Sequence, residues 1–297
     1  MNGVCKISSL SASILILSAP AAPATTADGC TQTSAPIETD RPDVTNSSVV
    51  VPFGSFQSEN GVNISRREGA QIFDGTNTRM RFGIAPCLEV LVDLPSYVTA
   101  FSGPGGSGFT NVAPAIKSQI SPMPGKFDLS MTIGAGLPTG ATAIAGPGVQ
   151  PYLQFPWSLE LGGGWGISGM VTNFFVPADP VNKYTNQSTF VIEKQFGERR
   201  FLFVEYVGDF PLVGGARQLF NSGGGYRITN TQQIDFHVGF GLNRNAPTYI
   251  FGIGYSFRLD GLFNRNGSRP RSDWGAYDQD IARARRAPEA APARQGL

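Results

Sequence analysis

Fifteen titratable side chains stand at alternate positions of short apolar runs, and these are the residues that could do chemistry. Nine are acidic, five are basic and one is the only histidine of the chain. They are Glu59, Arg79, Arg81, Glu89, Asp93, Lys117, Asp128, Glu160, Glu193, Glu205, Asp209, Arg227, Asp235, His237 and Arg258. Because charges removed from water need partners, this mixture favours a salt-bridged interior. The alternative is a selectivity zone, since rings of charged side chains decide which solutes pass a pore; an acidic excess favours cations or neutral polar solutes.

Covalent catalysis is not expected from these residues. Alternation places His237 on the same face as Asp235, but a hydrolase also needs a nucleophile beside the base, and a site inside the lumen is poorly placed for attack on a lipid. One histidine without further ligands does not make a metal site. We therefore predict no catalytic residue, no metal and no cofactor.

Neither the two glycine runs nor the net charge of the chain indicates binding of nucleotide phosphates or nucleic acid. Glycines 162–164 and 223–225 lack the following helix and lysine of a phosphate-binding loop, and we expect both runs inside strands of a crowded, curved wall. The net charge is only +1, and the body of the chain shows no clustered basic face, so nucleic acid is not an expected partner.

The elements that must position these side chains are short strands. Apolar and polar residues alternate with period two, which puts one set toward lipid and the other toward a lumen. Residues 249–258, for example, carry aromatic and aliphatic side chains on one face and Gly, Ser and Arg on the other. Twelve such runs are predicted, at residues 56–64, 79–84, 88–94, 112–120, 128–133, 149–155, 159–167, 190–196, 202–210, 220–228, 234–241 and 249–258.

These runs predict an all-β fold: a transmembrane, antiparallel up-and-down β-barrel of about 12 strands. No stretch after the first 27 residues has 18 consecutive apolar residues, and a closed barrel is the other way to satisfy every backbone group in hydrocarbon. A soluble β-sandwich is disfavoured because its outward faces would be charged. The expected place is the outer membrane of a Gram-negative bacterium, with lipid, a small-molecule solute and the barrel-assembly machinery as partners.

Connections of alternating length support the barrel, since outer-membrane barrels have short periplasmic turns and longer external loops. Short connections are expected at residues 85–87, 122–126, 156–158, 197–199 and 229–231. Longer ones are expected at 65–77, 97–108, 138–148, 176–187, 211–217 and 243–247.

Four regions follow from this pattern. Residues 1–27 have a basic start, a short apolar core and small residues, as a secretory signal peptide does. Residues 28–53 form a periplasmic extension or a plug, residues 54–259 the barrel, and residues 260–297 a disordered tail rich in Arg, Pro and Ala. Cys30 and Cys87 remain after signal cleavage, either as a disulfide or as two unrelated thiols.

The segment from Glu38 to Asp43 is charged but has no strand of its own. Its plug candidates are Glu38, Asp40, Arg41 and Asp43, which could find partners among the lumen charges. A plain periplasmic linker is the alternative, because polar segments are common at termini. Barrels of 12 strands lie between filled 8-strand and open 16-strand ones, so a narrow or partly plugged pore is expected.

Several short motifs carry a family resemblance. These are Glu38-Thr39-Asp40-Arg41-Pro42-Asp43, Val51-Pro52-Phe53-Gly54, Phe56 to Gly61, Arg79 to Ile84 and Leu137-Pro138-Thr139-Gly140. Over roughly residues 37–259 the chain resembles the family described as "Putative MetA-pathway of phenol degradation". The resemblance implies an outer-membrane transporter-like barrel and an aromatic or hydrophobic solute. One departure is that Phe257 is followed by 40 further residues (297 − 257), so an internal assembly signal ending at Phe257 is expected.

The resulting prediction is an outer-membrane barrel that passes or binds small molecules without covalent chemistry. The aromatic or hydrophobic solute rests on the resemblance alone, and the polar lumen argues against it. The alternative is a structural or adhesive barrel with a closed lumen, and a barrel lipase is a distant third.

Overall fold

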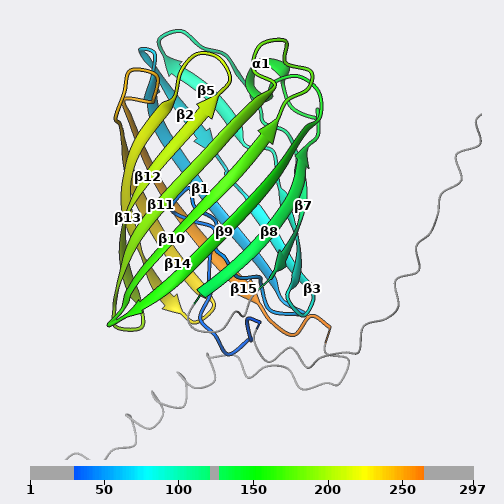
Figure 1. The fold of residues 1–297 in the computed structure, drawn as a ribbon, viewed down its shortest axis with the longest axis vertical. Coiled ribbons are helices and arrows are strands. Elements are labelled where there is room, and N and C mark those ends of the chain that lie inside the picture. Colours follow the sequence, from blue (N-terminus) through cyan, green and yellow to red (C-terminus); the bar gives the residue numbers. More distant parts are fainter. Residues whose placement is uncertain (1–29, 121–126, 264–297) are drawn as a thin grey trace, which may run out of the picture.

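The computed structural model describes residues 30–120 and 127–263, and its main feature is one sheet that closes on itself. In Figure 1 the strands run obliquely around a cylinder, and β15 pairs with β1 to close it. The strands are β1 (Phe56–Arg67), β2 (Ala70–Gly75), β3 (Arg79–Ala85), β4 (Leu88–Asp93), β5 (Tyr97–Ser102), β6 (Ser107–Phe109), β7 (Ala113–Gln119), β8 (Phe127–Gly136), β9 (Gln150–Gly162), β10 (Trp165–Phe175), β11 (Tyr184–Phe196), β12 (Arg200–Pro211), β13 (Arg217–Thr229), β14 (Gln232–Gly241) and β15 (Tyr249–Leu259). One short helix, α1 (Thr142–Ala145), lies at the end that carries the longer connections, called here the loop end. Within the described residues, no helix is long and apolar enough to cross a membrane.

The fifteen segments make twelve barrel strands. β2 with β3, β4 with β5, and β6 with β7 are consecutive halves of one strand each, so the count is 15 − 3 = 12. β1, for example, pairs with β3 through Glu59 opposite Arg79 and with β2 through Val62 opposite Gly75. The predicted antiparallel 12-strand barrel is confirmed.

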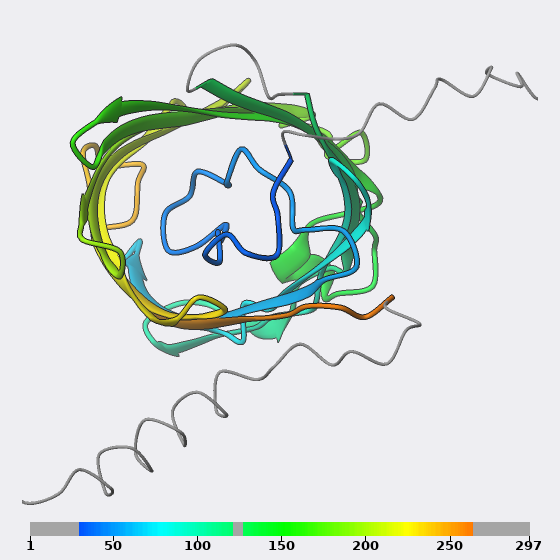
Figure 2. The same ribbon diagram turned by 90° about the horizontal axis from the view of Figure 1, so that it is seen from below.

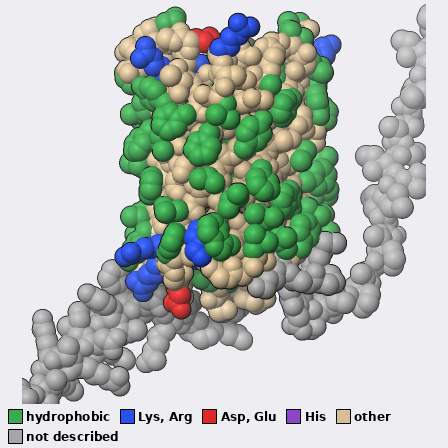
Figure 3. Space-filling model, turned by 60° about the vertical axis from the view of Figure 1, so that its left-hand side comes forward, with side chains coloured by type: hydrophobic (Ala, Val, Ile, Leu, Met, Phe, Trp, Pro, Cys, Tyr) green, Lys and Arg blue, Asp and Glu red, His purple; other side chains and the backbone are tan. Residues whose placement is uncertain are grey.

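The two faces of the wall are the reverse of those in a water-soluble protein. Large apolar side chains point outward, such as Ile133 at 56% exposure and Ile253 at 50%, while Arg81 and Glu89 inside are fully buried. On the face drawn in Figure 3, apolar side chains cover much of the height of the barrel, and basic side chains gather near its two ends. An apolar band flanked by polar ends fits a hydrocarbon layer, and a closed barrel leaves no unpaired strand edge in it. The chain is therefore an outer-membrane β-barrel.

One hairpin differs from the prediction. The turn expected at residues 156–158 lies inside β9, and the expected strand at 159–167 is instead the end of β9, a turn and the start of β10. The turn consists of Gly163 and Gly164 and follows Gly162, the last residue of β9; the φ angles of the three glycines are 89°, 59° and 78°. Only glycine adopts such left-handed angles without strain, so this run makes the turn, and our placement of it within a strand was wrong. Glycines 223–225, in contrast, lie within β13 as expected.

The strands also extend further toward the loop end than predicted. Most of the loop expected at 65–77 is β2 and the end of β1, and the loop expected at 97–108 contains β5 and most of β6. β11 likewise begins at Tyr184, inside the loop expected at 176–187. Backbone pairing with neighbouring strands overrides weak local patterns, which explains these shifts. The predicted signal peptide, the turn at 122–126 and the tail from residue 264 lie outside the described residues.

The segment before β1 lies inside the barrel. Figure 2, seen along the barrel, shows the chain that precedes β1 looping within the ring of strands. Cys30 and Cys87 form a disulfide with their Cα atoms 5.4 Å apart, which ties the start of this segment to the connection between β3 and β4. Residues 30–55 are called the plug segment below.

We predict that neither cysteine of this pair reacts with a maleimide in denaturant unless a reductant is added first. The thiols are consumed in a covalent bond that survives unfolding. Mass spectrometry of the denatured, maleimide-treated protein measures this, and the matched control is the same sample after reduction. Labelling of both cysteines without reductant would contradict the pairing.

Candidate functional site

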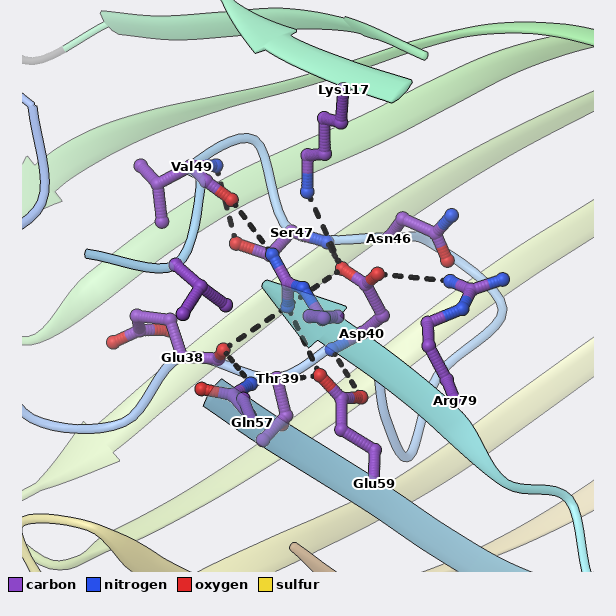
Figure 4. Close-up of polar contacts among 12 residues, drawn as sticks. Glu38, Thr39, Asp40, Asn46, Ser47, Val49, Gln57, Glu59, Arg79 and Lys117 are labelled. Carbon is purple, nitrogen blue, oxygen red and sulfur yellow. Dashed lines mark hydrogen bonds and ion pairs between the residues drawn. The ribbon is translucent and has the colours of Figure 1, made fainter. Parts of the chain in front are cut away.

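Asp40 is the centre of the contacts between the plug segment and the wall. Its carboxylate lies 2.9 Å from Arg79 Nη1, 3.4 Å from Arg81 Nη1 and 3.5 Å from Lys117 Nζ (Figure 4). Burial alone would raise its pKa, but Arg81, Lys117 and Arg79 together hold the pKa of Asp40 below its usual range. The side chain is therefore a buried, charged anchor shared by β3 and β7.

Arg81 extends this anchor across the first strands of the barrel. Its guanidinium is fully buried and lies 3.0 Å from Glu59 Oε1 and 2.8 Å from Glu89 Oε1. The same two carboxylates accept backbone hydrogen bonds from the plug segment, Glu59 from the Asp40 N–H at 2.8 Å and Glu89 from the Val51 N–H at 2.7 Å. The plug backbone is thus bonded to groups that are themselves held by ion pairs.

Glu205 makes a second anchor on β12. Its carboxylate accepts hydrogen bonds from the Val44 N–H at 3.0 Å, the Thr45 N–H at 2.9 Å and the Thr45 hydroxyl at 2.8 Å. Asn221 of β13 donates to it as well, at 2.9 Å. Four donors on one carboxylate leave little acceptor capacity free, because an ionised carboxylate has about four lone-pair sites.

Arg41 lies in a slot made by two glycines. Gly61 of β1 and Gly254 of β15 are paired opposite each other where the barrel closes. A Cβ atom at Gly61 would lie 2.3 Å from Arg41 Cζ, and one at Gly254 would lie 2.5 Å from Arg41 Nε, so the guanidinium occupies the space that both side chains lack. Its Nη2 reaches Asp235 Oδ1 of β14 at 3.3 Å. Three adjacent strands therefore hold this side chain.

The start of the plug segment is held near the opposite end from the loops, called here the turn end. Glu38 pairs with Arg227 of β13 at 3.0 Å. Arg258 of β15 donates to the carbonyl oxygens of Thr33 and Ala35, both at 2.9 Å. Together with the disulfide, these contacts fix the entry of the segment into the barrel.

The other predicted lumen residues also lie on the inner face. Asp93 pairs with Arg79 at 2.6 Å, and Asp209 pairs with Arg217 at 3.3 Å. Both ring nitrogens of His237 lie 3.2 Å from amide oxygens, those of Asn221 and Asn63. Asp128, Glu160 and Glu193 line a cavity at the turn end.

Sequence reasoning missed the uncharged members of the site. Gln57, Gln119, Gln154, Thr189 and Gln233 all point inward and bond to the plug segment. The same period-2 alternation could have found them, because each lies on the polar face of its strand. An uncharged side chain on the polar face of a strand stands out less than a charged one, which is why these five residues were missed.

The plug segment divides the lumen into two cavities. One of about 800 Å³ reaches the loop end, and one of about 400 Å³ reaches the turn end. Arg41, Asp43 and Asn46 line both cavities and so form the partition between them. Burial raises the pKa of Asp43, and the nearby carboxylates of Glu205 and Glu193 raise it further, so this residue gains a proton more readily than an exposed aspartate.

The cavity walls offer polar and aromatic contacts but no assembled metal site. Among the described residues, no group of three His, Cys, Asp or Glu side chains is placed to hold a metal ion. The larger cavity is lined by amides, hydroxyls and charged groups as well as by apolar side chains, among them the rings of Tyr152 and Phe174, whose centroids are 6.1 Å apart. Such a lining can bind a small solute by hydrogen bonds and ring contacts.

The fold and the site together define a class: an outer-membrane β-barrel whose lumen is occupied by its own N-terminal segment. The family model "Putative MetA-pathway of phenol degradation" matches residues 39–259, which is most of the chain. The protein belongs to this family, and the resemblance stated from its motifs is confirmed.

Comparison with solved structures finds other barrels at low similarity. The NanC porin has a TM-score of 0.49 at 8% identity, with 69% of this chain and 100% of that chain covered. The CymD monoaromatic hydrocarbon channel has a TM-score of 0.43 at 10% identity, with 71% and 90% covered. An anion-selective porin from Comamonas acidovorans has 0.36 at 8% identity, with 69% and 98% covered. These values are too low to support an inference about function. Among curated proteins, none matches the chain significantly.

Proposed function

We propose that this protein is an outer-membrane channel for small molecules, narrowed by its own plug segment. The observation that carries the proposal is the pair of cavities, one toward each end of the barrel, which share Arg41, Asp43 and Asn46 as a thin partition. A structural barrel with a filled lumen has no need of about 800 Å³ of space behind its loops. A partition held by side chains rather than by a folded domain suits a channel that opens briefly.

The contacts of the candidate catalytic pair support transport rather than an enzyme. His237 is bonded to two amides, and Asp235 is bonded to Arg41 instead of orienting the imidazole. A base without an orienting carboxylate or an adjacent nucleophile lacks the arrangement that covalent catalysis requires. Solute passage needs neither.

The solute that we propose is small and able to form hydrogen bonds. The family description names phenol degradation, and a phenol combines a ring with a hydroxyl group. Tyr152 and Phe174 offer ring contacts in the larger cavity, next to amides such as Gln150 and Gln154. A purely hydrophobic solute could not form hydrogen bonds with these amides, and it would displace water from the charged groups of the lining, which is unfavourable.

Liposome swelling tests the proposal. Full-length protein in liposomes should admit arabinose, and the rate should fall steeply for larger neutral sugars because the partition is narrow. Protein-free liposomes give the background. If neither the wild-type protein nor a variant with a loosened plug raises swelling above this background, the lumen is closed and the structural role replaces transport.

A further inference from the structure

The attachment of the plug segment to the wall is unequal around the barrel. Charged groups hold it to β1, β3, β4 and β7, and again to β12, β13, β14 and β15, through the contacts described above. On β9 its hydrogen bonds join uncharged groups: Asn46 Nδ2 donates to Gln154 Oε1 at 3.2 Å, and the hydroxyls of Ser48 and Ser158 are 2.7 Å apart. Hydrogen bonds between neutral groups are weaker than charge-assisted ones. By the hydrogen bonds of the described residues, the plug segment is thus held less firmly against β9 than against these eight strands.

The wall on this side carries hydroxyl groups without a partner. Ser130 and Thr132 of β8 and Thr172 of β10 are at most 2% exposed. Among the described residues, their hydroxyl oxygens have no hydrogen-bond partner. Each lies between outward apolar neighbours, such as Ile133 and Val171, and so faces the lumen. Buried hydroxyls normally find partners, so three unbonded ones close together are a specific feature of this wall.

Strand register arranges these groups as a ladder between the cavities. Thr132, Gln154 and Thr172 are directly paired across β8, β9 and β10. Two positions further along β8 lies Ser130, and two beyond it Asp128 is paired with Ser158. Gln154 lines the larger cavity, while Ser158 lines the smaller one. Successive inward positions on a strand are about 7 Å apart, so the rungs bridge the height of the partition.

The geometry points to this ladder as the solute path: small, neutral, hydroxyl-bearing molecules pass between Asn46 and the β8–β10 wall. Solute hydroxyls exchange hydrogen bonds with Thr132, Gln154, Thr172 and Ser130 as the plug segment lifts from β9. Asn46 is the movable barrier, because its side chain is held to β9 by a hydrogen bond between two neutral amides, whereas Arg41 is fixed in its slot by an ion pair with Asp235. Charged solutes would lose hydration along a stretch of uncharged groups and are disfavoured. This inference rests on the proposed channel function.

Cysteines placed on the ladder test the path. Thr172→Cys and Thr132→Cys keep the side-chain size, and the two native cysteines of the described residues, Cys30 and Cys87, are consumed in their disulfide. Ser256→Cys is the matched control, since Ser256 is also buried, inward and without a partner among the described residues, but lies on β15 across the barrel. Folding of each variant is checked by heat-modifiable gel mobility before use.

After treatment with hydroxyethyl methanethiosulfonate, the two ladder variants should lose most of their arabinose swelling rate and Ser256→Cys should keep its own. Asn46→Ala should raise the rate several-fold without reagent. Suppose that the wild type swells but that the reagent lowers the swelling rate of the ladder variants no more than that of Ser256→Cys. This result would overturn the path while leaving the channel function intact. No swelling by wild type or Asn46→Ala would instead refute the channel itself.

The same swelling experiment, carried out with charged and neutral solutes, tests the preference for neutral molecules. Arabinose should enter several-fold faster than potassium arabinonate or N-methylglucamine hydrochloride, which carry a negative and a positive charge at similar size. Equal or faster entry of either charged polyol would overturn the preference for neutral solutes. A size series of neutral polyols distinguishes this chemical preference from simple sieving.

Discussion

Replacing Arg81 with alanine should destabilise the barrel by about 3–5 kcal/mol, the usual effect of removing one member of a buried ion pair. Arg81 is fully buried between Glu59 and Glu89 and also lies 3.4 Å from Asp40. Without its guanidinium, these carboxylates stay in the lumen with much less compensating charge. Urea unfolding in detergent, followed by gel mobility, measures the decrease in the free energy of unfolding.

Two further variants make this prediction specific. Arg67→Ala removes an arginine whose surface pair with Glu68 spans 3.8 Å, and such pairs contribute only about 0–1 kcal/mol. Arg81→Met combined with Glu89→Gln should recover part of the lost stability, because the double variant removes both charges of this ion pair. Unfolding of Arg81→Ala at the same urea concentration as Arg67→Ala would show that the buried cluster does not stabilise the fold.

Alanine at Gly61 or Gly254 should raise arabinose swelling several-fold. The new methyl group occupies the place of the Arg41 guanidinium, and a flexible side chain moves more readily than the paired backbone of β1 and β15. Arg41 would then lose its ion pair with Asp235, and one third of the partition would be free to move.

The matched control is Gly106→Ala, which adds the same methyl group where nothing lies within 4 Å. Its swelling rate should equal that of the wild type. Arg41→Ala should reproduce the effect of the glycine variants. If the Gly254→Ala protein folds and its rate does not change, Arg41 does not restrict the lumen.

Local alternation was enough to predict the wall and the inward position of its charges. Arg79, Arg81 and Glu89 are placed by period two alone, whatever the neighbouring strands do. The charged motif that contains Asp40 and Arg41 stood out because it had no strand to belong to. The hairpin at Gly162 was missed because Pro156 and Ser158 are residue types that favour turns, so the turn was expected there and not at the three glycines.

The contacts of the site depend on register and on chain closure, which one sequence does not display. Glu205 bonds to Thr45 across 160 positions. Gly61 and Gly254 meet only because the first and last strands pair in one particular register. A shift of one residue would turn every side chain to the other face, so these neighbours follow from the closed barrel and not from local pattern.

Single-channel recording in planar bilayers tests the central claim most directly, with full-length wild-type protein and Glu205→Gln compared in the same salt. The substitution keeps the volume of Glu205 but replaces one acceptor oxygen with a donor facing the Val44 and Thr45 N–H groups. The plugged-channel account predicts small, brief openings for the wild type and larger or longer ones for Glu205→Gln. The account would be contradicted if neither folded protein showed channel openings, or if both showed large currents of equal size.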